Sequence, residues 1–193
     1  MLMAEGQHSH CICGANHRDI GEHKVEASVS FDKKLSSNYS RMLEIDNKQA
    51  TFEYIEGREY CVLPEGNYYL DSDVLIKQSI LIKEGTVNIC LNGHKLSLNY
   101  SQKQIFEVIQ LNGGTLNLTD CKSTGKVSRD DTASYGRGVT MGNGTSFTLY
   151  GGTICDNQAC ASSKTTAQGG GVYIGSSSTF NMYGGKISNN RAT

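Results

Sequence analysis

The sequence predicts an all-β protein, a right-handed single-stranded parallel β-helix (a solenoid of stacked coils) with a small irregular N-terminal cap. One observation is an internal repeat: residues 136–160 match residues 169–193 at eleven of 25 positions, at an offset of 33 residues. The other is the spacing of apolar residues, which recur at every second position between glycine-rich turns. This spacing is typical of short strands. After Cys61 no stretch keeps the 3.6-residue apolar period of a helix.

Two weaker copies of the repeat precede these, and the four copies align apolar residues one coil apart. A single copy cannot bury its apolar side chains alone, whereas copies stacked at about 4.8 Å, the inter-strand spacing, bury them on one another. An ankyrin array has a similar period but is excluded, because each of its units needs two helices. We also expect Asn157 and Asn190 to form an amide ladder at a turn. The aligned apolar pairs are Val87/Ile89, Leu116/Leu118, Phe147/Leu149 and Phe180/Met182.

Composition divides the chain into three parts. Residues 1–24 are a Cys/His-rich N-terminal segment, residues 25–60 are capping strands or a linker, and residues 61–193 are the parallel β-helix repeats. Short alternations of apolar and polar residues are typical of half-buried strands. The short elements expected within the cap are strands at 24–31 and 51–55, and either one helical turn or a loop at 35–43.

Charge and hydropathy exclude two kinds of partner. The 18 basic and 19 acidic residues give a net charge of −1, which excludes the strongly basic surface that binds nucleic acid or anionic membranes. No apolar run approaches the roughly 20 residues of a membrane-spanning helix. Residues 1–6 lack the basic and then apolar layout of a signal peptide. Either the protein is intracellular, or a leader that this chain does not contain has been removed.

Cysteine and histidine gather near the N-terminus at the close spacing of metal ligands. Thiolates and imidazoles bind zinc, and two of each satisfy a tetrahedral ion. The repeat alignment places two further cysteines on adjacent coils, where they complete the site or form disulfides that hold the segment on the solenoid. Free thiols on a disordered leader are the third alternative. The candidate zinc ligands are His8, His10, Cys11, Cys13, His17, Cys90 and Cys121, with His94 as a further donor close to Cys90.

Candidate catalytic residues are few in the repeats. Asp130 and Asp131, with Arg137 nearby, are the grouping with the residue types of acid–base chemistry. A solvated loop is the simpler interpretation of this segment, and it is the one we favour. Asp156 aligns with an asparagine in the next copy, so no ladder of carboxylates is expected on any face of the solenoid. This pattern weakens the case for an enzyme.

Two tyrosines are the candidate binding residues. Tyr150 and Tyr183 occupy the same position of the repeat, one coil apart. Aromatic rings on a solenoid face are able to stack on sugar rings, so this pair predicts a glycan-binding position. The alternative is an aromatic stack whose role is to stabilise neighbouring coils, and we favour it over ligand binding.

Several segments of the sequence resemble those of Gram-positive bacterial cell-surface or adhesion-like proteins. These proteins carry glycine-rich right-handed β-helix repeats of the pectate-lyase-like superfamily. The resemblance covers roughly residues 1–20 and 61–193, and it is specific for architecture and weak for activity. The segments that carry the resemblance are His8–Gly14, Gly66–Leu70, Ile89–His94, Leu116–Cys121, Gly169–Ile174 and Phe180–Ile187.

The resemblance implies a secreted or cell-surface module without catalytic activity, which binds a glycan or a host or cell-surface protein for adhesion. Enzymes of the superfamily hold calcium on clustered aspartates with an arginine as base, or hydrolyse glycosides with paired carboxylates. A polysaccharide lyase or hydrolase is therefore the second expectation. The third is a structural subunit that associates end to end, because an open solenoid end exposes unpaired strand edges.

Overall fold

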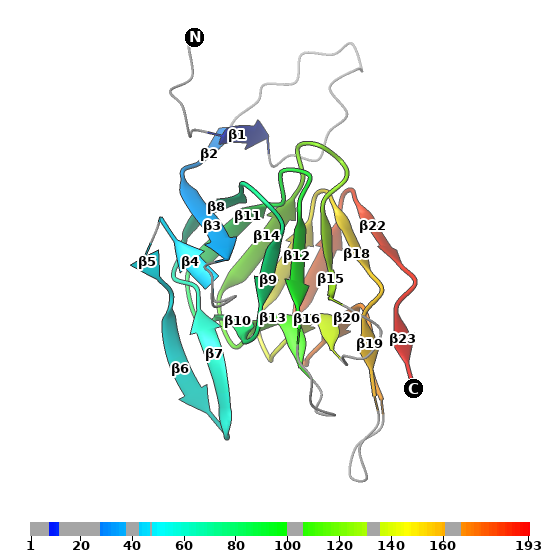
Figure 1. The fold of residues 1–193 in the computed structure, drawn as a ribbon. Coiled ribbons are helices and arrows are strands. Elements are labelled where there is room, and N and C mark those ends of the chain that lie inside the picture. Colours follow the sequence, from blue (N-terminus) through cyan, green and yellow to red (C-terminus); the bar gives the residue numbers. More distant parts are fainter. Residues whose placement is uncertain are drawn as a thin grey trace.

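Successive coils stack their strands into three sheets, which together form a parallel β-solenoid (Figure 1). The computed structural model describes residues 8–11, 28–37, 43–46, 48–99, 106–130, 136–160 and 167–193. Within these ranges every regular element is a strand. The all-β prediction and the parallel solenoid are thus confirmed. None of the described residues belongs to a helix long and apolar enough to cross a membrane.

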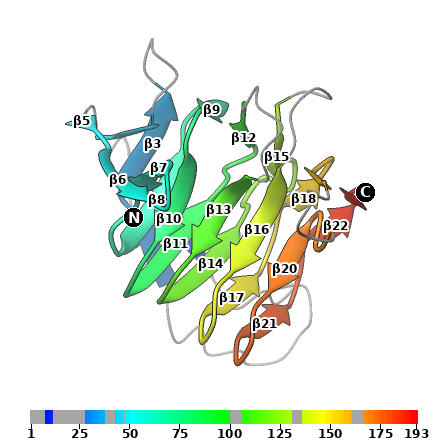
Figure 2. The ribbon, with the colours of Figure 1, turned by 90° about the horizontal axis from the view of Figure 1, so that it is seen from below.

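Each sheet gathers the corresponding strands of five coils, seen side by side in Figure 2. The first sheet contains β7 (Arg58–Val62), β10 (Ser79–Ile82), β13 (Glu107–Leu111), β16 (Arg137–Met141) and β20 (Val172–Ile174). The second contains β8 (Gly66–Leu70), β11 (Thr86–Cys90), β14 (Thr115–Thr119), β17 (Ser146–Leu149) and β21 (Thr179–Met182). The third contains β9 (Val74–Ile76), β12 (Lys95–Leu98), β15 (Lys126–Arg129), β18 (Thr153–Cys155) and β22 (Lys186–Ser188), followed by the short pair β19 (Gln158–Ala159) and β23 (Arg191–Ala192).

The apolar ladders expected from the repeat are present in the expected register. Leu116 pairs with Val87 on one side and with Phe147 on the other, and Phe147 pairs with Phe180. The rings of Phe147 and Phe180 lie 5.1 Å apart between centroids. Because these side chains point inward from successive coils, one continuous core runs along the solenoid axis.

The asparagine ladder at the turn is also confirmed. Asn157 Nδ2 donates to Asn190 Oδ1 at 3.0 Å, and the backbone N–H of Asn157 donates to the same oxygen at 3.1 Å. Asn157 Nδ2 also lies 3.2 Å from the carbonyl oxygen of Val127, one coil earlier. The side chain of Asn157 therefore connects three successive coils.

Antiparallel strands cover the N-terminal end of the solenoid. Strand β6 (Thr51–Ile55) is the strand that the alternation predicted, and it pairs antiparallel with β7. Strand β3 (Lys33–Ser37) extends the second sheet in parallel with β8, and β4 (Leu43–Ile45) and β5 (Lys48–Gln49) complete it in antiparallel order. The cap buries Leu35 and Leu43 completely against the core.

The cap differs from the sequence prediction in one segment and agrees with it in the described part of another. The helical turn or loop expected at 35–43 is wrong in its described part, because β3 and β4 are strands. The edge of β8 supplies unpaired backbone groups that bind an added strand, and a local apolar pattern does not report this tertiary pairing. Of the strand expected at 24–31, the structure describes β2 (Ser28–Phe31), which pairs antiparallel with β1 (His8–Cys11).

The last coil differs from the others in burial. Ile174, Met182 and Ile187 are 48%, 46% and 37% exposed. One coil earlier, the residues paired with them (Met141, Leu149 and Ile154) are fully buried. The difference has a simple cause, since a coil between two neighbours is covered on both sides, whereas the last described coil is covered on one.

Candidate functional site

The outer face of the second sheet carries polar side chains in register from coil to coil. Val87, Ile89 and their partners point into the core, so the alternate positions of each strand point outward. We call the set of in-register residues at one such position a column. The asparagine column is Asn67, Asn88, Asn117, Thr148 and Asn181. The hydroxyl column, two residues earlier in each strand, is Thr86, Thr115, Ser146 and Thr179.

The amides of the asparagine column form a hydrogen-bonded ladder, which the sequence analysis did not identify. Asn88 Nδ2 donates to Asn67 Oδ1 at 2.7 Å, and Asn117 Nδ2 donates to Asn88 Oδ1 at 2.8 Å. Asn88 both donates and accepts in the ladder, whereas Asn67 only accepts and Asn117 only donates, so the two end amides keep more hydrogen-bonding capacity. The ladder fixes the side-chain conformations, so this face is rigid and regular.

The two candidate tyrosines flank the same face. Tyr150 and Tyr183 follow β17 and β21 directly, two residues beyond the asparagine column, and their rings stack with centroids 5.6 Å apart and planes 24° apart. Rings that stack on each other do not offer their shared faces to a sugar. The geometry therefore favours the stabilising role for the pair, and it leaves the 63% exposed ring of Tyr183 as the larger aromatic surface open to a ligand.

These columns are free of charge. From Asn67 to Asn181, the residues of the asparagine and hydroxyl columns are amides and alcohols only. Charge enters this sheet at Lys34 of β3, which pairs with Tyr69 of β8 and lies 3.4 Å from the Asp71 carboxylate. Thr86 and Thr179 are exposed and most of the other column residues are half-buried, whereas Asn88 and Thr148 are only 8% and 7% exposed. The accessible groups of the columns are therefore uncharged hydrogen-bonding groups, which suit an uncharged ligand.

The structure gives the candidate catalytic residues separate structural partners. Asp130 Oδ2 accepts a hydrogen bond from Asn99 Nδ2 at 3.1 Å, and Asp130 Oδ1 lies 3.7 Å from Lys95 Nζ. Arg137 Nε donates to the carbonyl oxygen of Gln168 at 2.8 Å, and its guanidinium lies over the Tyr173 ring. Asp131 lies outside the described residues.

A different carboxylate, Glu107 at the start of β13, was missed by the sequence analysis. Its side chain is buried, 3% exposed, although the neighbouring coil places Arg137 beside it. Burial raises the pKa of Glu107 to about 7, and the charges of Arg58 and Arg137 oppose the rise. The signal available in the sequence was a charged residue in line with the apolar positions of an otherwise apolar strand. Because the carboxyl group is buried, a polymeric substrate does not reach it.

The zinc prediction falls largely outside the described side chains. His8, His10 and Cys11 form β1, of which only the backbone is described, and Cys13 and His17 lie outside the described residues. Cys90 is buried, and burial raises the pKa of its thiol to about 12. Cys121 Sγ lies 3.4 Å from Asn92 Oδ1. Within the described ranges, no three His, Cys, Asp or Glu side chains group as a metal site would require, and the zinc site stays a prediction.

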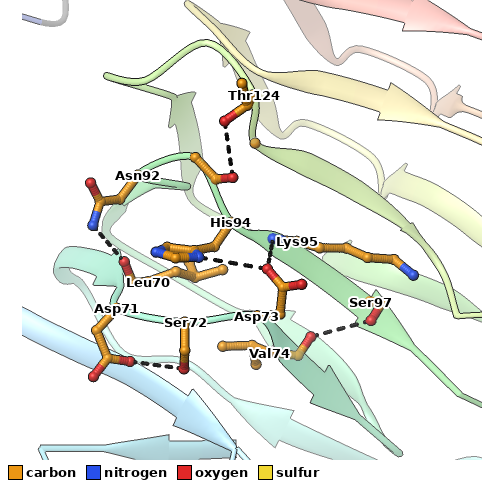
Figure 3. A network of polar contacts seen from close by, with 12 residues as sticks. Leu70, Asp71, Ser72, Asp73, Val74, Asn92, His94, Lys95, Ser97 and Thr124 are labelled. Carbon is orange, nitrogen blue, oxygen red and sulfur yellow. Dashed lines mark hydrogen bonds and ion pairs between the residues drawn. The ribbon is translucent and has the colours of Figure 1, made fainter.

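His94 belongs to a network of turn contacts (Figure 3). Its Nδ1 lies 3.6 Å from Asp73 Oδ1, which also accepts the backbone N–H of Lys95 at 2.8 Å. In the same network Asn92 Nδ2 donates to the carbonyl oxygen of Leu70, and Thr124 Oγ1 donates to that of Gly93. These bonds tie the turns of three successive coils together, so the residues around His94 have a structural role.

A hollow lies between the cap and the first two coils. Glu53, Glu65, Glu84 and Lys83 line it together with apolar residues. The Lys83 ammonium lies 2.9 Å from a Glu53 carboxylate oxygen. This ion pair joins β6 of the cap to the solenoid, and the hollow is part of the seam between them.

Comparison with protein-family models, with curated proteins and with solved structures finds no match to this chain. The parallel solenoid is established by its own geometry. The Gram-positive origin and the pectate-lyase-like superfamily implied by the resemblance stay predictions, as do the three-part division of the chain and its location.

Proposed function

We propose that the protein is a non-catalytic binding module, secreted or displayed at a cell surface, which holds a neutral glycan on the outer face of the second sheet. The observation that carries the proposal is the uncharged, in-register array of amides and hydroxyls on that face. Under this proposal the solenoid is right-handed and belongs to the bacterial surface proteins that the sequence resembles. Adhesion is then the biological role that the module serves.

The chemistry of the face suits a carbohydrate. Sugars present many hydroxyl groups, each a donor and an acceptor, and amide and hydroxyl side chains match both functions. The columns repeat with the spacing of neighbouring strands, about 4.8 Å, so a polymer with a regular repeat meets the same groups on each coil. The exposed ring of Tyr183 adds an apolar contact at the edge of the array.

Two observations favour binding over catalysis. The Asp130 carboxylate, 31% exposed, is already held by a hydrogen bond from Asn99 and an ion pair with Lys95. The Glu107 carboxyl group is buried. A lyase or hydrolase needs an accessible acid or base beside its substrate. The enzyme therefore stays the alternative proposal, with Asp130, Asp131 and Arg137 as its candidates.

A structural role is the other alternative, and the last coil favours it. The exposed apolar side chains of Ile174, Met182 and Ile187 are the kind of surface that a stacked neighbour covers. Under this alternative a second copy of the chain associates at that end, so sedimentation would show oligomers whose mass rises with concentration. A monomer at high concentration would contradict it.

The test is a panel of neutral and acidic polysaccharides, read at the same time for retention of the protein and for release of products. We expect retention on a neutral polysaccharide without product. Ser146→Arg places a bulky charge on the face and should abolish retention, whereas Thr153→Arg, on the third sheet, should not. Tyr183→Ala should weaken retention, whereas Tyr54→Ala, another exposed tyrosine, in β6 of the cap, should leave it unchanged.

Three outcomes would overturn the proposal. Retention that Ser146→Arg leaves intact would remove the second sheet as the binding face. Product release abolished by Asp130→Ala would identify an enzyme. Capture by a purified surface protein, with none of the polysaccharides retaining the chain, would replace the glycan with a protein partner.

A further inference from the structure

A polar row crosses the first sheet at the start of its strands. Cys61, Ile80 and Ile109 pair across β7, β10 and β13. Two residues before each of them, the same register places Glu59, Gln78 and Glu107 side by side. Arg137 of β16 pairs with Glu107 and extends the row. Three coils therefore place a glutamate, a glutamine and a second glutamate at neighbouring positions of the sheet.

The hydrogen bonding of this row is incomplete on one side. Gln78 Nε2 donates to Glu59 Oε2 at 2.9 Å. Gln78 Oε1 and Glu107 Oε1 are both buried and have no hydrogen-bond partner among the described side chains and backbone. Two buried acceptors on adjacent coils, each without a donor, are unfavourable because both have lost their hydrogen bonds to water.

The amide geometry explains which group must supply the missing donor. An amide between two carboxyl groups on opposite sides turns its NH₂ toward one and its oxygen toward the other. Glu59 is exposed and accepts from the NH₂. Turning the amide round would place its oxygen against that exposed carboxylate. With its NH₂ on the Glu59 side, the Gln78 amide has its oxygen on the side of β13, the strand that begins with Glu107.

We propose that Glu107 is a neutral carboxylic acid in the folded protein and donates its O–H to Gln78 Oε1, so that a proton-dependent hydrogen bond joins the second and third coils. The proton satisfies both unpaired acceptors at once. Hydrogen bonds then run without interruption from Glu107 through Gln78 to Glu59.

The surrounding charges are consistent with a neutral acid. Burial is the largest influence on Glu107 and raises its pKa to about 7, more than Arg58 and Arg137 lower it. Both guanidiniums have other contacts: Arg58 lies over the Phe106 ring at 4.9 Å, and Arg137 binds Gln168 and Tyr173.

A tyrosine and an arginine are further ionisable groups on the strands packed around Glu107. Tyr60 on β7 is buried and its pKa is raised, first by burial and next by the charge of Glu107. On β15, Arg129 Nε donates to the carbonyl oxygen of Asp156. The phenol is neutral near pH 7, so it does not compensate an ionised Glu107.

The sign of the pH dependence follows from the two states. A glutamate in an unfolded chain has a pKa near 4.5, and Glu107 in the fold has one of about 7. The folded state therefore binds the proton more tightly, so the stabilisation is complete below pH 4.5 and is lost as the pH rises through about 7. Between pH 5 and pH 8, this one group changes the unfolding equilibrium constant by about 70-fold.

The test compares wild type with Glu107→Gln in urea unfolding from pH 5 to pH 8. Glutamine keeps a donor for Gln78 and does not titrate. In the variant, the unfolding equilibrium constant should no longer show the roughly 70-fold change between pH 5 and pH 8. The variant should also be at least as stable as wild type at pH 8. The control Glu59→Gln changes the exposed end of the row and should keep the pH dependence. A Glu107→Gln variant less stable than wild type at pH 8 would show that an ionised Glu107 stabilises the fold, and would overturn the proposal.

A spectroscopic measurement covers the case in which the variant does not fold. Infrared difference spectra of the wild-type protein between pH 5 and pH 8, with glutamate labelled with ¹³C at its carboxyl group, report a protonated buried carboxyl by its C=O band. We expect this band at pH 6, where ordinary glutamates are ionised. Its absence at pH 6 would refute the neutral acid.

Discussion

The continuous core makes a quantitative prediction about one substitution at two equivalent positions. Phe147 and Phe180 hold the same place in the repeat and stack on each other. Phe147 is fully buried between Leu116 and Phe180, so Phe147→Ala should lower the free energy of unfolding by about 3–5 kcal/mol. Phe180 is partly exposed and covered on one side, so Phe180→Ala should cost about 1–2 kcal/mol.

The assay is urea unfolding at low protein concentration, followed by far-UV circular dichroism and by the fluorescence of the ten tyrosines, since the chain has no tryptophan. Both probes must give the same midpoint and the same m-value, because a repeat protein is able to lose coils separately. Equal losses for the two variants would refute the argument, since that result would mean that the last coil is covered as fully as the fourth.

Three further predictions concern single sites. Asn157→Ala removes the bonds that join three coils and should cost about 1–3 kcal/mol of unfolding free energy, measured by urea unfolding. Iodoacetamide at pH 8 should alkylate the partly exposed Cys160 and spare Cys90, whose pKa of about 12 leaves little thiolate; peptide mass spectrometry reports both. Gly113→Ala should destabilise the fold strongly, because a Cβ there would collide with the carbonyl oxygen of Lys83, and thermal unfolding measures the loss.

Each of these has an outcome that contradicts it. An unchanged midpoint for Asn157→Ala would remove the turn ladder as a stabilising element. Rapid alkylation of Cys90 in the folded state would show that the buried thiol is accessible. Gly57→Ala is a control of the opposite kind, since nothing lies near a Cβ at Gly57 and only its positive φ is strained; a larger loss there than at position 113 would contradict the collision argument.

The repeat alone was enough to predict the stacking of the coils. Pairing of Phe147 with Phe180 and of Asn157 with Asn190 followed from an alignment of the sequence with itself, because in a solenoid equivalent positions of the repeat become spatial neighbours. The same argument placed Tyr150 beside Tyr183. Contacts between equivalent positions of neighbouring coils could therefore be predicted without a structure.

Contacts that involve segments outside the repeat could not be predicted from the sequence. Strand β3 pairs with β8, and no local pattern in 35–43 reports an open strand edge elsewhere in the chain. Glu107 was missed for a related reason: its environment includes Arg58, which lies in the first coil, before the four copies that align by sequence. The ladder of Asn67 and Asn88 likewise begins in this first coil.

The position of the antiparallel cap has a consequence for the order in which the protein is made. Strands β3 to β6 precede the coils in the chain, so a ribosome releases the cap before the coils. Each later coil needs only the edge of the coil before it as a template, and its contacts are therefore short in sequence. We expect the solenoid to lengthen coil by coil behind the emerging chain, without waiting for synthesis to finish.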